Sequence, residues 1–242
     1  DMENTNGEKN NAILQVRDLA VAIGGEKILS GINFEVEKGD VLAIVGPNGA
    51  GKSVLLRTLL GFQPYEGAVE WKKDIKIGYV PQKFFIDREM PLTVGEFLDL
   101  RGMGDLDKEA LLKSVGVGGN ASAPSFLAKR LGILSAGQIQ RVLVAWGIAG
   151  GPDVLLFDEP TTGIDIGGEE TIYNLLHDLQ AKKEITLLLV SHDLDVVYRH
   201  ANKVLCLNKQ MVCFGAPQEV FIPEHMTQMY GKEMSFYQHH GH

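Results

Sequence analysis

The sequence predicts an α/β protein with a mostly parallel sheet, an N-terminal antiparallel β subdomain and an inserted α-helical subdomain. Three observations support this fold class. Short apolar runs of strand length alternate with helical patterns in the second half of the chain, which is typical of a parallel sheet with helices on its faces. Two strand patterns near the N-terminus flank a Gly-Gly turn. Between residues 88 and 150 the pattern is helical and interrupts the alternation.

The expected strands differ in how they are buried. Ile13–Ile23 and Ile32–Val36 lie on either side of Gly24-Gly25 and form the antiparallel part. The run VLAIV is apolar at every position, as expected of a strand buried on both faces. The remaining expected strands are Val41–Val45 (this run), Val69–Trp71, Ile77–Val80, Val154–Phe157, Leu187–Val190 and Val204–Leu207.

The expected helices complete one α/β core. Thr93 and Glu96 have the spacing of a capping box, and Gly61 is placed to end a helix. Because buried strands resume after residue 150, the helical stretch is an insertion into one core, joined by right-handed crossovers, and not a separate domain. The expected helices are Val54–Leu60, one after Thr93, Lys108–Val115, Ala136–Ala149, about Glu169–Lys183 and Leu194–His200.

These elements define the expected domain organisation. We expect a disordered N-terminus over residues 1–11 and a single domain over residues 12–222, with the helical insertion at about 88–150. A C-terminal extension with a His-rich tail would occupy residues 223–242.

Composition excludes several classes of protein. The 242 residues carry a formal net charge of −8 and no run rich in Lys or Arg, which argues against a nucleic-acid partner. No apolar run reaches the length of about eighteen residues that a membrane span needs, so work at a membrane would require a separate membrane chain. The polar N-terminus has no signal-peptide core. We expect Cys206 and Cys213 to be two buried thiols rather than a disulfide framework or a zinc site.

A phosphate-binding loop follows the run VLAIV. GPNGAGKS, residues 46–53, lies between an expected strand and an expected helix, the context that confirms a P-loop over a mere tight turn. Its glycines let backbone N–H groups wrap the phosphates, Lys52 reaches the β and γ oxygens, and the Ser53 hydroxyl binds Mg²⁺. The expected nucleotide-binding residues of the loop are Gly46, Pro47, Asn48, Gly49, Ala50, Gly51, Lys52, Ser53 and Val54.

Polar side chains follow three of the expected strands. In VLLFDE, Asp158 can hold Mg²⁺, directly or through water, and Glu159 is placed to act as a general base on water near the γ-phosphate. Gln82 and His192 also follow strands, at the ends where ligands gather in open α/β sheets. A lone Gln or His at such a position is more often structural, so both readings remain open from these residues alone.

The stretch LSAGQIQR, Leu134–Arg141, predicts a second anion site. Ser135 is a good N-cap, small residues follow it, and an apolar stripe at helical spacing begins at Ile139. A helix N-terminus with free N–H groups and small residues suits an anion. The P-loop already provides a phosphate site, so the residues alone do not explain a second one.

In combination these motifs resemble the ATPase subunits of ABC transporters. GPNGAGKS, the Gln of YVPQ, LSAGQIQR, VLLFDEP, the Asp of TTGID and the His of VSHD occur in the order of that family over about residues 12–222. The resemblance implies ATP and Mg²⁺ as cofactors. It implies Ser53, Gln82 and Asp158 around the metal, and Glu159, His192 and Gln82 as the catalytic group.

The resemblance also accounts for the second anion site. In this family two copies face head to tail on ATP, and the signature of each copy covers the nucleotide of the other. Further implied partners are integral membrane permease subunits and, indirectly, a periplasmic or lipoprotein metal-binding protein. The implied location is peripheral, on the cytoplasmic face of the inner (plasma) membrane. The residues implied to act across the dimer are Ser135, Ala136, Gly137, Gln138 and Asp165.

Longer stretches are similar to the ATPase subunit of bacterial zinc uptake transporters. They are YVPQKFFIDREMPLTVGEFLDLR, VSHDLDVV, VLCLNKQMVCFG and the terminal HHGH, whose His239, His240 and His242 either buffer metal or belong to a cloning remnant. The implied function is an ATP-hydrolysing subunit that powers divalent-metal import, with zinc ahead of manganese and iron. The alternatives are a soluble non-transport ABC ATPase and an ABC importer subunit for another substrate.

Three positions depart from the family pattern. Ala136 replaces a Gly, which adds a methyl group beside the partner's γ-phosphate and bears on turnover more than on binding. Ile23 stands where an aromatic side chain normally stacks on adenine, and we place it in the ATP site. Trp146-Gly147 replaces the usual Arg-Ala, and a Gly inside a helix costs about 1 kcal/mol relative to Ala.

Overall fold

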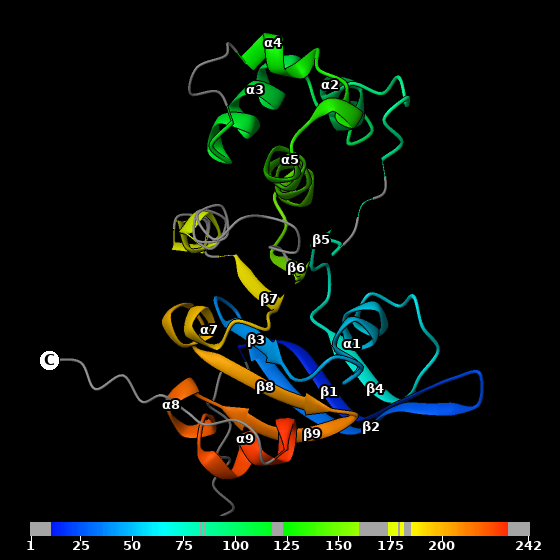
Figure 1. Cartoon of the computed structure of the whole chain (residues 1–242), viewed down its shortest axis with the longest axis vertical. Coiled ribbons are helices and arrows are strands. Elements are labelled where there is room, and N and C mark those ends of the chain that lie inside the picture. Colours follow the sequence, from blue (N-terminus) through cyan, green and yellow to red (C-terminus); the bar gives the residue numbers. More distant parts are fainter. Residues whose placement is uncertain are drawn as a thin grey trace, which may run out of the picture.

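The computed structural model describes residues 11–82, 84, 86–117, 123–159, 174–178, 180–181 and 185–231 (Figure 1). Our expectations for residues 1–10 and for the His-rich tail fall outside these ranges. Of the helix expected at about Glu169–Lys183, residues 174–178 and 180–181 are described, and they are helical. Among the described residues no helix is both long and apolar enough to cross a membrane.

The N-terminal part is the predicted antiparallel sheet. Strand β1 (Ala12–Ile23) pairs with β2 (Glu26–Glu37) on one side and with β4 (Glu66–Trp71) on the other. Gly24 and Gly25 form the turn between β1 and β2 with φ of 59° and 84°, a conformation that favours glycine. Strand β2 therefore begins directly after this turn, ahead of the expected start at Ile32.

The remaining strands form the predicted, mostly parallel sheet. Pairing is parallel from β8 through β3, β7 and β6 to β5, and the hairpin of β8 and β9 is antiparallel. One parallel bridge between β2 and β9 joins this sheet to the antiparallel one, giving the order β4-β1-β2-β9-β8-β3-β7-β6-β5. These strands are β3 (Val41–Val45), β5 (Ile77–Val80), β6 (Val154–Asp158), β7 (Thr186–Val190), β8 (Lys203–Asn208) and β9 (Gln210–Gly215).

Two hydrophobic cores cover the two faces of the parallel sheet. All residues of β3 are buried, because successive side chains point to opposite faces and each face is covered. Leu42 and Ile44 pack in the core that contains the antiparallel sheet and α1 (Lys52–Leu59). Ala43 faces the core that contains α5 (Ala136–Ile148).

The inserted helical subdomain stands apart from the sheets, and α5 lies between it and β5 (Figure 1). The predicted capping box is present, because the Thr93 hydroxyl accepts from the Glu96 N–H at 3.2 Å and the Glu96 carboxylate accepts from the Thr93 N–H at 2.8 Å. Besides α5, the described helices here are α2 (Val94–Asp99), α3 (Asp105–Ser114), α4 (Ala123–Leu127) and a 3₁₀ turn (Leu131–Ile133).

The cysteines correct one expectation. Cys206 of β8 and Cys213 of β9 are buried, as expected, but they form a disulfide and are not free thiols. Strand β9 was not among the expected strands, and its pairing with β8 places the two residues directly opposite each other. Their Cα atoms are 4.9 Å apart, within the range that a disulfide spans.

The C-terminal boundary is also corrected. After α7 (Leu194–His200), which has the expected bounds, come α8 (Pro217–Val220) and α9 (Pro223–Tyr230). Met226 and Met229 of α9 are buried in the same core as α5, so the helix is part of the domain. The folded domain therefore continues beyond residue 222, where we expected it to end.

Candidate functional site

The predicted phosphate loop connects β3 to α1, and its glycines are required by the geometry. Gly51 precedes α1 with φ of 97°, and no described side chain caps this helix. The first N–H groups of α1 are therefore placed to bind an anion. At Gly46, φ is 155° and an added Cβ would lie 2.0 Å from the Leu207 carbonyl oxygen. Strand β8 thus packs against the loop at Gly46, at a distance that only glycine allows.

Lys52 lies inside the loop. Its ammonium group donates to the carbonyl oxygens of Gly46 and Pro47 at 2.9 and 3.1 Å, and its Nζ lies 3.9 Å from a carboxylate oxygen of Glu159. Burial lowers the pKa of Lys52, and the charges of Glu159 and Asp158 act against this shift. The acids thus favour the charged ammonium at the place where phosphate oxygens would sit.

Ser53 and Asp158 form an oxygen pair beside the loop. The Ser53 hydroxyl donates to Asp158 Oδ1 at 2.8 Å, and Asp158, the last residue of β6, is 2% exposed. Burial raises the pKa of Asp158, while the hydrogen bond from Ser53 lowers it. A hydroxyl and a carboxylate in contact are oxygen donors of the kind that Mg²⁺ takes beside phosphates, so the donor set fits this ion.

Gln82 and Glu159 meet at the ends of neighbouring strands. Strands β5 and β6 are parallel and paired, so the residues that follow them emerge at one edge of the sheet. There the Gln82 amide N–H donates to the Glu159 carboxylate. Glu159 has φ of 48°, in the left-handed region that non-glycine residues rarely adopt and that recurs at functional sites. The two predicted catalytic side chains are therefore in direct contact.

A cavity of about 410 Å³ is lined by Lys52, Ser53, Gln82 and Glu159, and Asp158 lies behind Ser53, outside this lining. Sequence reasoning missed one of its residues, Ile28 of β2, because an isoleucine in a strand shows no pattern that separates a cavity-lining position from a core position. The lining residues are Ile28, Asn48, Gly49, Ala50, Gly51, Lys52, Ser53, Val54, Gln82 and Glu159.

Two predicted site residues lie apart from this cavity. Ile23, at the end of β1, is 42% exposed and is not among the lining residues. His192 follows β7, is exposed and is also absent from the lining. Neither residue is therefore among those that line the cavity in a single copy of the chain.

The LSAGQ residues also lie away from the cavity. Ser135 is the N-cap of α5, as predicted, and it forms a capping box with Gln138 that sequence reasoning overlooked. Ser135 and Ala136 are exposed and Gly137 is half-buried, and a Cβ added to Gly137 would meet nothing within 4 Å among the described residues. The chain does not fold its own signature onto its own P-loop. Asp165, the other residue predicted to act with it, falls outside the described residues.

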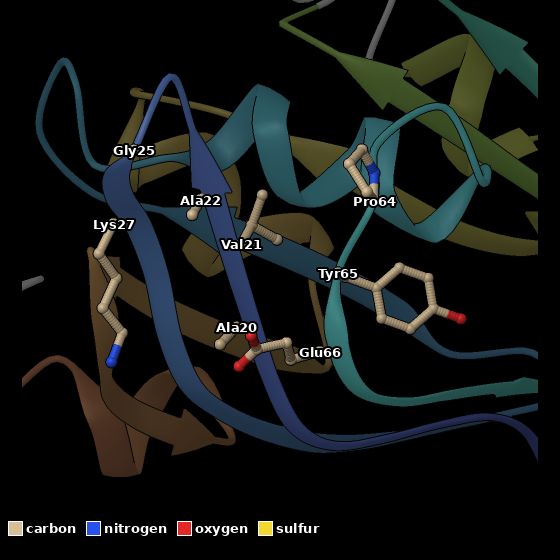
Figure 2. A pocket seen from close by; sticks show the side chains of 8 residues that line it. All are labelled: Ala20, Val21, Ala22, Gly25, Lys27, Pro64, Tyr65 and Glu66. Atoms are coloured by element: carbon tan, nitrogen blue, oxygen red, sulfur yellow. The ribbon is translucent and has the colours of Figure 1, made fainter.

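A second cavity of about 400 Å³ lies on the antiparallel sheet, beside the hairpin that ends β1 (Figure 2). Its residues come from the β1–β2 hairpin and from the segment that leads into β4. The Tyr65 ring extends away from the hairpin strands in Figure 2. The lining contains none of the predicted site residues; it is formed by Ala20, Val21, Ala22, Gly25, Lys27, Pro64, Tyr65 and Glu66.

The fold and the cavity at the loop define a P-loop nucleotide-binding protein, and comparisons narrow the class. The family model described as ABC transporter matches residues 29–162. The zinc import ATP-binding protein ZnuC of Paracoccus denitrificans is 41% identical over 230 residues, 92% of this chain and 88% of the relative. The chain therefore belongs to the ABC transporter family, and it is an ATPase subunit of this class.

Solved structures agree with this assignment. A metal-chelate type ABC transporter in an inward-facing conformation matches with a TM-score of 0.79 and 27% identity over 91% of this chain and 89% of that chain. An ATP-binding cassette in its ADP conformation matches with a TM-score of 0.76 and 25% identity over 90% and 98% of the two chains. These matches confirm the predicted fold class.

Proposed function

We propose that the chain powers import of a divalent metal, zinc first among the candidates, by hydrolysing ATP beside a membrane permease. The observation that carries the chemistry is the meeting of Lys52, Ser53, Asp158, Gln82 and Glu159 around the P-loop. The 41% identity to a zinc import ATP-binding protein supports the choice of metal.

The residues of the site have separate roles in ATP hydrolysis. The P-loop N–H groups and Lys52 bind the phosphates of ATP. Ser53, Asp158 and Gln82 would hold Mg²⁺, which neutralises charge on the β- and γ-phosphates. Glu159 takes a proton from the attacking water as the new P–O bond forms and ADP leaves. Gln82 positions the Glu159 carboxylate through its amide N–H.

A second copy of the chain completes the site. The N-terminus of α5, with Ser135 and Ala136 exposed and Gly137 beside them, binds the γ-phosphate held by another copy, since it lies outside the cavity of its own chain. We assign Gln138 and Asp165 to the same face of the head-to-tail dimer. His192 and Ile23 are assigned to the γ-phosphate and the adenine once this dimer has closed on ATP.

The helical subdomain supplies the surface for the permease. Leu100 is 70% and Phe84 41% exposed, and Phe84 is only two residues beyond Gln82. Apolar side chains at this level of exposure suit a protein partner. Docking there would keep the chain peripheral, on the cytoplasmic face of the inner membrane. A periplasmic or lipoprotein metal-binding protein would then act only through the permease.

The test is metal uptake by the assembled transporter. The chain would be produced together with its permease, reconstituted in vesicles, and supplied with ATP and radioactive zinc in the presence of competing manganese or iron. We expect ATP-dependent uptake that unlabelled zinc suppresses best. The Glu159→Gln variant should retain ATP binding and lose hydrolysis by a factor of about 10²–10⁴.

Two other results would redirect the proposal. Suppression by manganese or iron ahead of zinc would change the metal. ATP hydrolysis without any association with a membrane protein would favour a soluble ABC ATPase.

A further inference from the structure

Three aromatic rings connect the segment after Gln82 to helix α5. Phe84 and Phe97 have ring centroids 5.5 Å apart, and Phe97 stacks on Trp146 with centroids 4.3 Å apart and an interplanar angle of 26°. The middle ring is 5% exposed, so the stack passes through the interior of the helical subdomain. Arg101 covers Trp146 with its guanidinium carbon 4.8 Å from the ring centroid, which adds a cation–π contact.

The segment before Gln82 also touches α5. A Cβ on Gly147 would lie 2.8 Å from Val80 Cγ2, and a Cβ on Gly78 would lie 2.2 Å from the Gly147 carbonyl oxygen. Strand β5 therefore packs against the backbone of α5 itself. Helix α5 thus holds the chain on both sides of Gln82, through Gly147 before it and through Trp146, Phe97 and Phe84 after it.

We propose that Trp146 is a positioning residue for hydrolysis: its stack with Phe97 and Phe84 holds the Gln82 amide against Glu159. The inference rests on the catalytic role proposed above for Glu159. Ser135 begins the same helix that carries Trp146, so a displacement of α5 is transmitted to Gln82 as well as to the signature. Trp146 itself does not line the cavity, and its effect is on geometry rather than on contact with ATP.

The test compares Trp146→Ala with Trp146→Phe in the full chain. Removal of the ring should lower kcat for ATP about twofold to tenfold, the shift that one aromatic pair is worth, and leave the Kd for ATP unchanged. Trp146→Phe keeps a ring against Phe97 and should restore most of kcat. Tyr198→Ala is the matched control, because Tyr198 is an aromatic residue of α7 that is 51% exposed.

A second readout does not depend on hydrolysis. Hydrogen exchange of the peptide that contains Gln82 should accelerate about twofold to tenfold in Trp146→Ala and remain unchanged in Tyr198→Ala. If the unaltered chain failed to hydrolyse ATP, the proposed function would be lost while this exchange measurement still tested the stack.

Three outcomes would overturn the proposal. The first is an unchanged kcat in a folded Trp146→Ala, and the second is a Trp146→Phe as defective as Trp146→Ala. The third concerns the route through Phe84. The kcat losses of Phe84→Leu and Trp146→Ala should not add in the double variant, because both break one stack. Strict additivity would exclude this route.

Discussion

Asp158 and Glu159 are neighbours in the chain, and the structure gives them different surroundings. Asp158 ends a buried strand and accepts a hydrogen bond from Ser53, whereas Glu159 turns into the left-handed region and accepts one from Gln82. The sequence motif predicted a metal-binding acid followed by a base. It could not predict the positive φ, which directs the second carboxylate toward Gln82 and Lys52.

The burial of Asp158 predicts a pH-dependent change in stability. Its pKa in the folded chain lies above the ordinary value of 3.8, so the folded state binds the proton more tightly than the unfolded state. Stability therefore falls as pH rises from about 3.8 through the folded pKa. Asp158→Asn keeps an acceptor for Ser53 and removes the charge. The nucleotide-free variant should melt at a higher temperature than the unaltered chain at pH 7, and the difference should shrink toward pH 4.

The control for this prediction is the same melt with Mg²⁺ and ATP. Bound ligand stabilises the folded state more when its affinity is higher, so the unaltered chain, which keeps the Asp158 carboxylate, should now gain more than the variant. A difference in melting temperature that does not vary with pH would contradict the account of Asp158.

We expect substitutions of Ile23 to change the affinity for ATP. Stacking of a base on an aromatic ring is worth about 1–3 kcal/mol relative to alanine, and isoleucine already recovers part of that through apolar contact. Ile23→Tyr should therefore tighten ATP binding by less than about tenfold in an equilibrium titration. Ile23→Ala should weaken it. Unchanged affinity in both variants would place adenine away from β1.

At the scale of elements, Gly147 shows that helix propensity alone does not predict the effect of a substitution in α5. Helix propensity alone predicts that alanine would stabilise α5 by about 1 kcal/mol. The structure places β5 so close that a Cβ would lie 2.8 Å from Val80, which is fully buried in a strand and cannot move aside cheaply. The overpacking cost is typically about 1–3 kcal/mol.

Gly147→Ala should therefore lower the free energy of unfolding by up to about 2 kcal/mol in urea titrations, the overpacking cost less the helix gain. Gly137→Ala, in the same helix, is the matched control because its Cβ meets nothing within 4 Å among the described residues. It should leave stability equal or raise it by at most about 1 kcal/mol. Equal effects of the two substitutions would show that β5 does not restrict α5.

Strands and helices could be predicted from the sequence where their local pattern of apolar residues was strong. Val41–Val45 was recovered with its exact bounds, because apolar runs of strand length carry their own signal. Strand β9 and helix α9 were missed. The β9 segment has intermediate burial and no clear alternation, and α9 is recognisable only from Met226 and Met229 once β8 and β9 are in place. Because β9 was not predicted, the pairing of Cys206 with Cys213 could not be predicted either.

At the scale of the whole molecule, the sequence motifs predicted the residues of the candidate site but not which of them lie together. Asn48–Val54, Gln82 and Glu159 are far apart in the chain and line one cavity because parallel strands end at one edge of the sheet. The structure separates Ser135, Ala136 and Gly137 from that cavity. The composite site proposed above rests on this separation, since a second copy would then complete each site.

Complementation between two inactive variants tests the two-copy site most directly. Ser135→Arg places a long cation in the signature, and Lys52→Ala removes the phosphate-binding charge from the P-loop, so each homodimer should be nearly inactive. In a mixed dimer both defects fall in one composite site and the other site is intact. Hydrolysis should therefore return in part when the two proteins are mixed, with the permease present if the free chain is monomeric.

The control is a mixed dimer with Lys52→Ala in one chain only, which shows whether one intact site suffices for hydrolysis. If that dimer is active, the mixture of Ser135→Arg and Lys52→Ala should approach its rate. No recovered hydrolysis in mixed dimers that demonstrably form, beside an active control, would mean that each chain builds its site alone and would contradict the account.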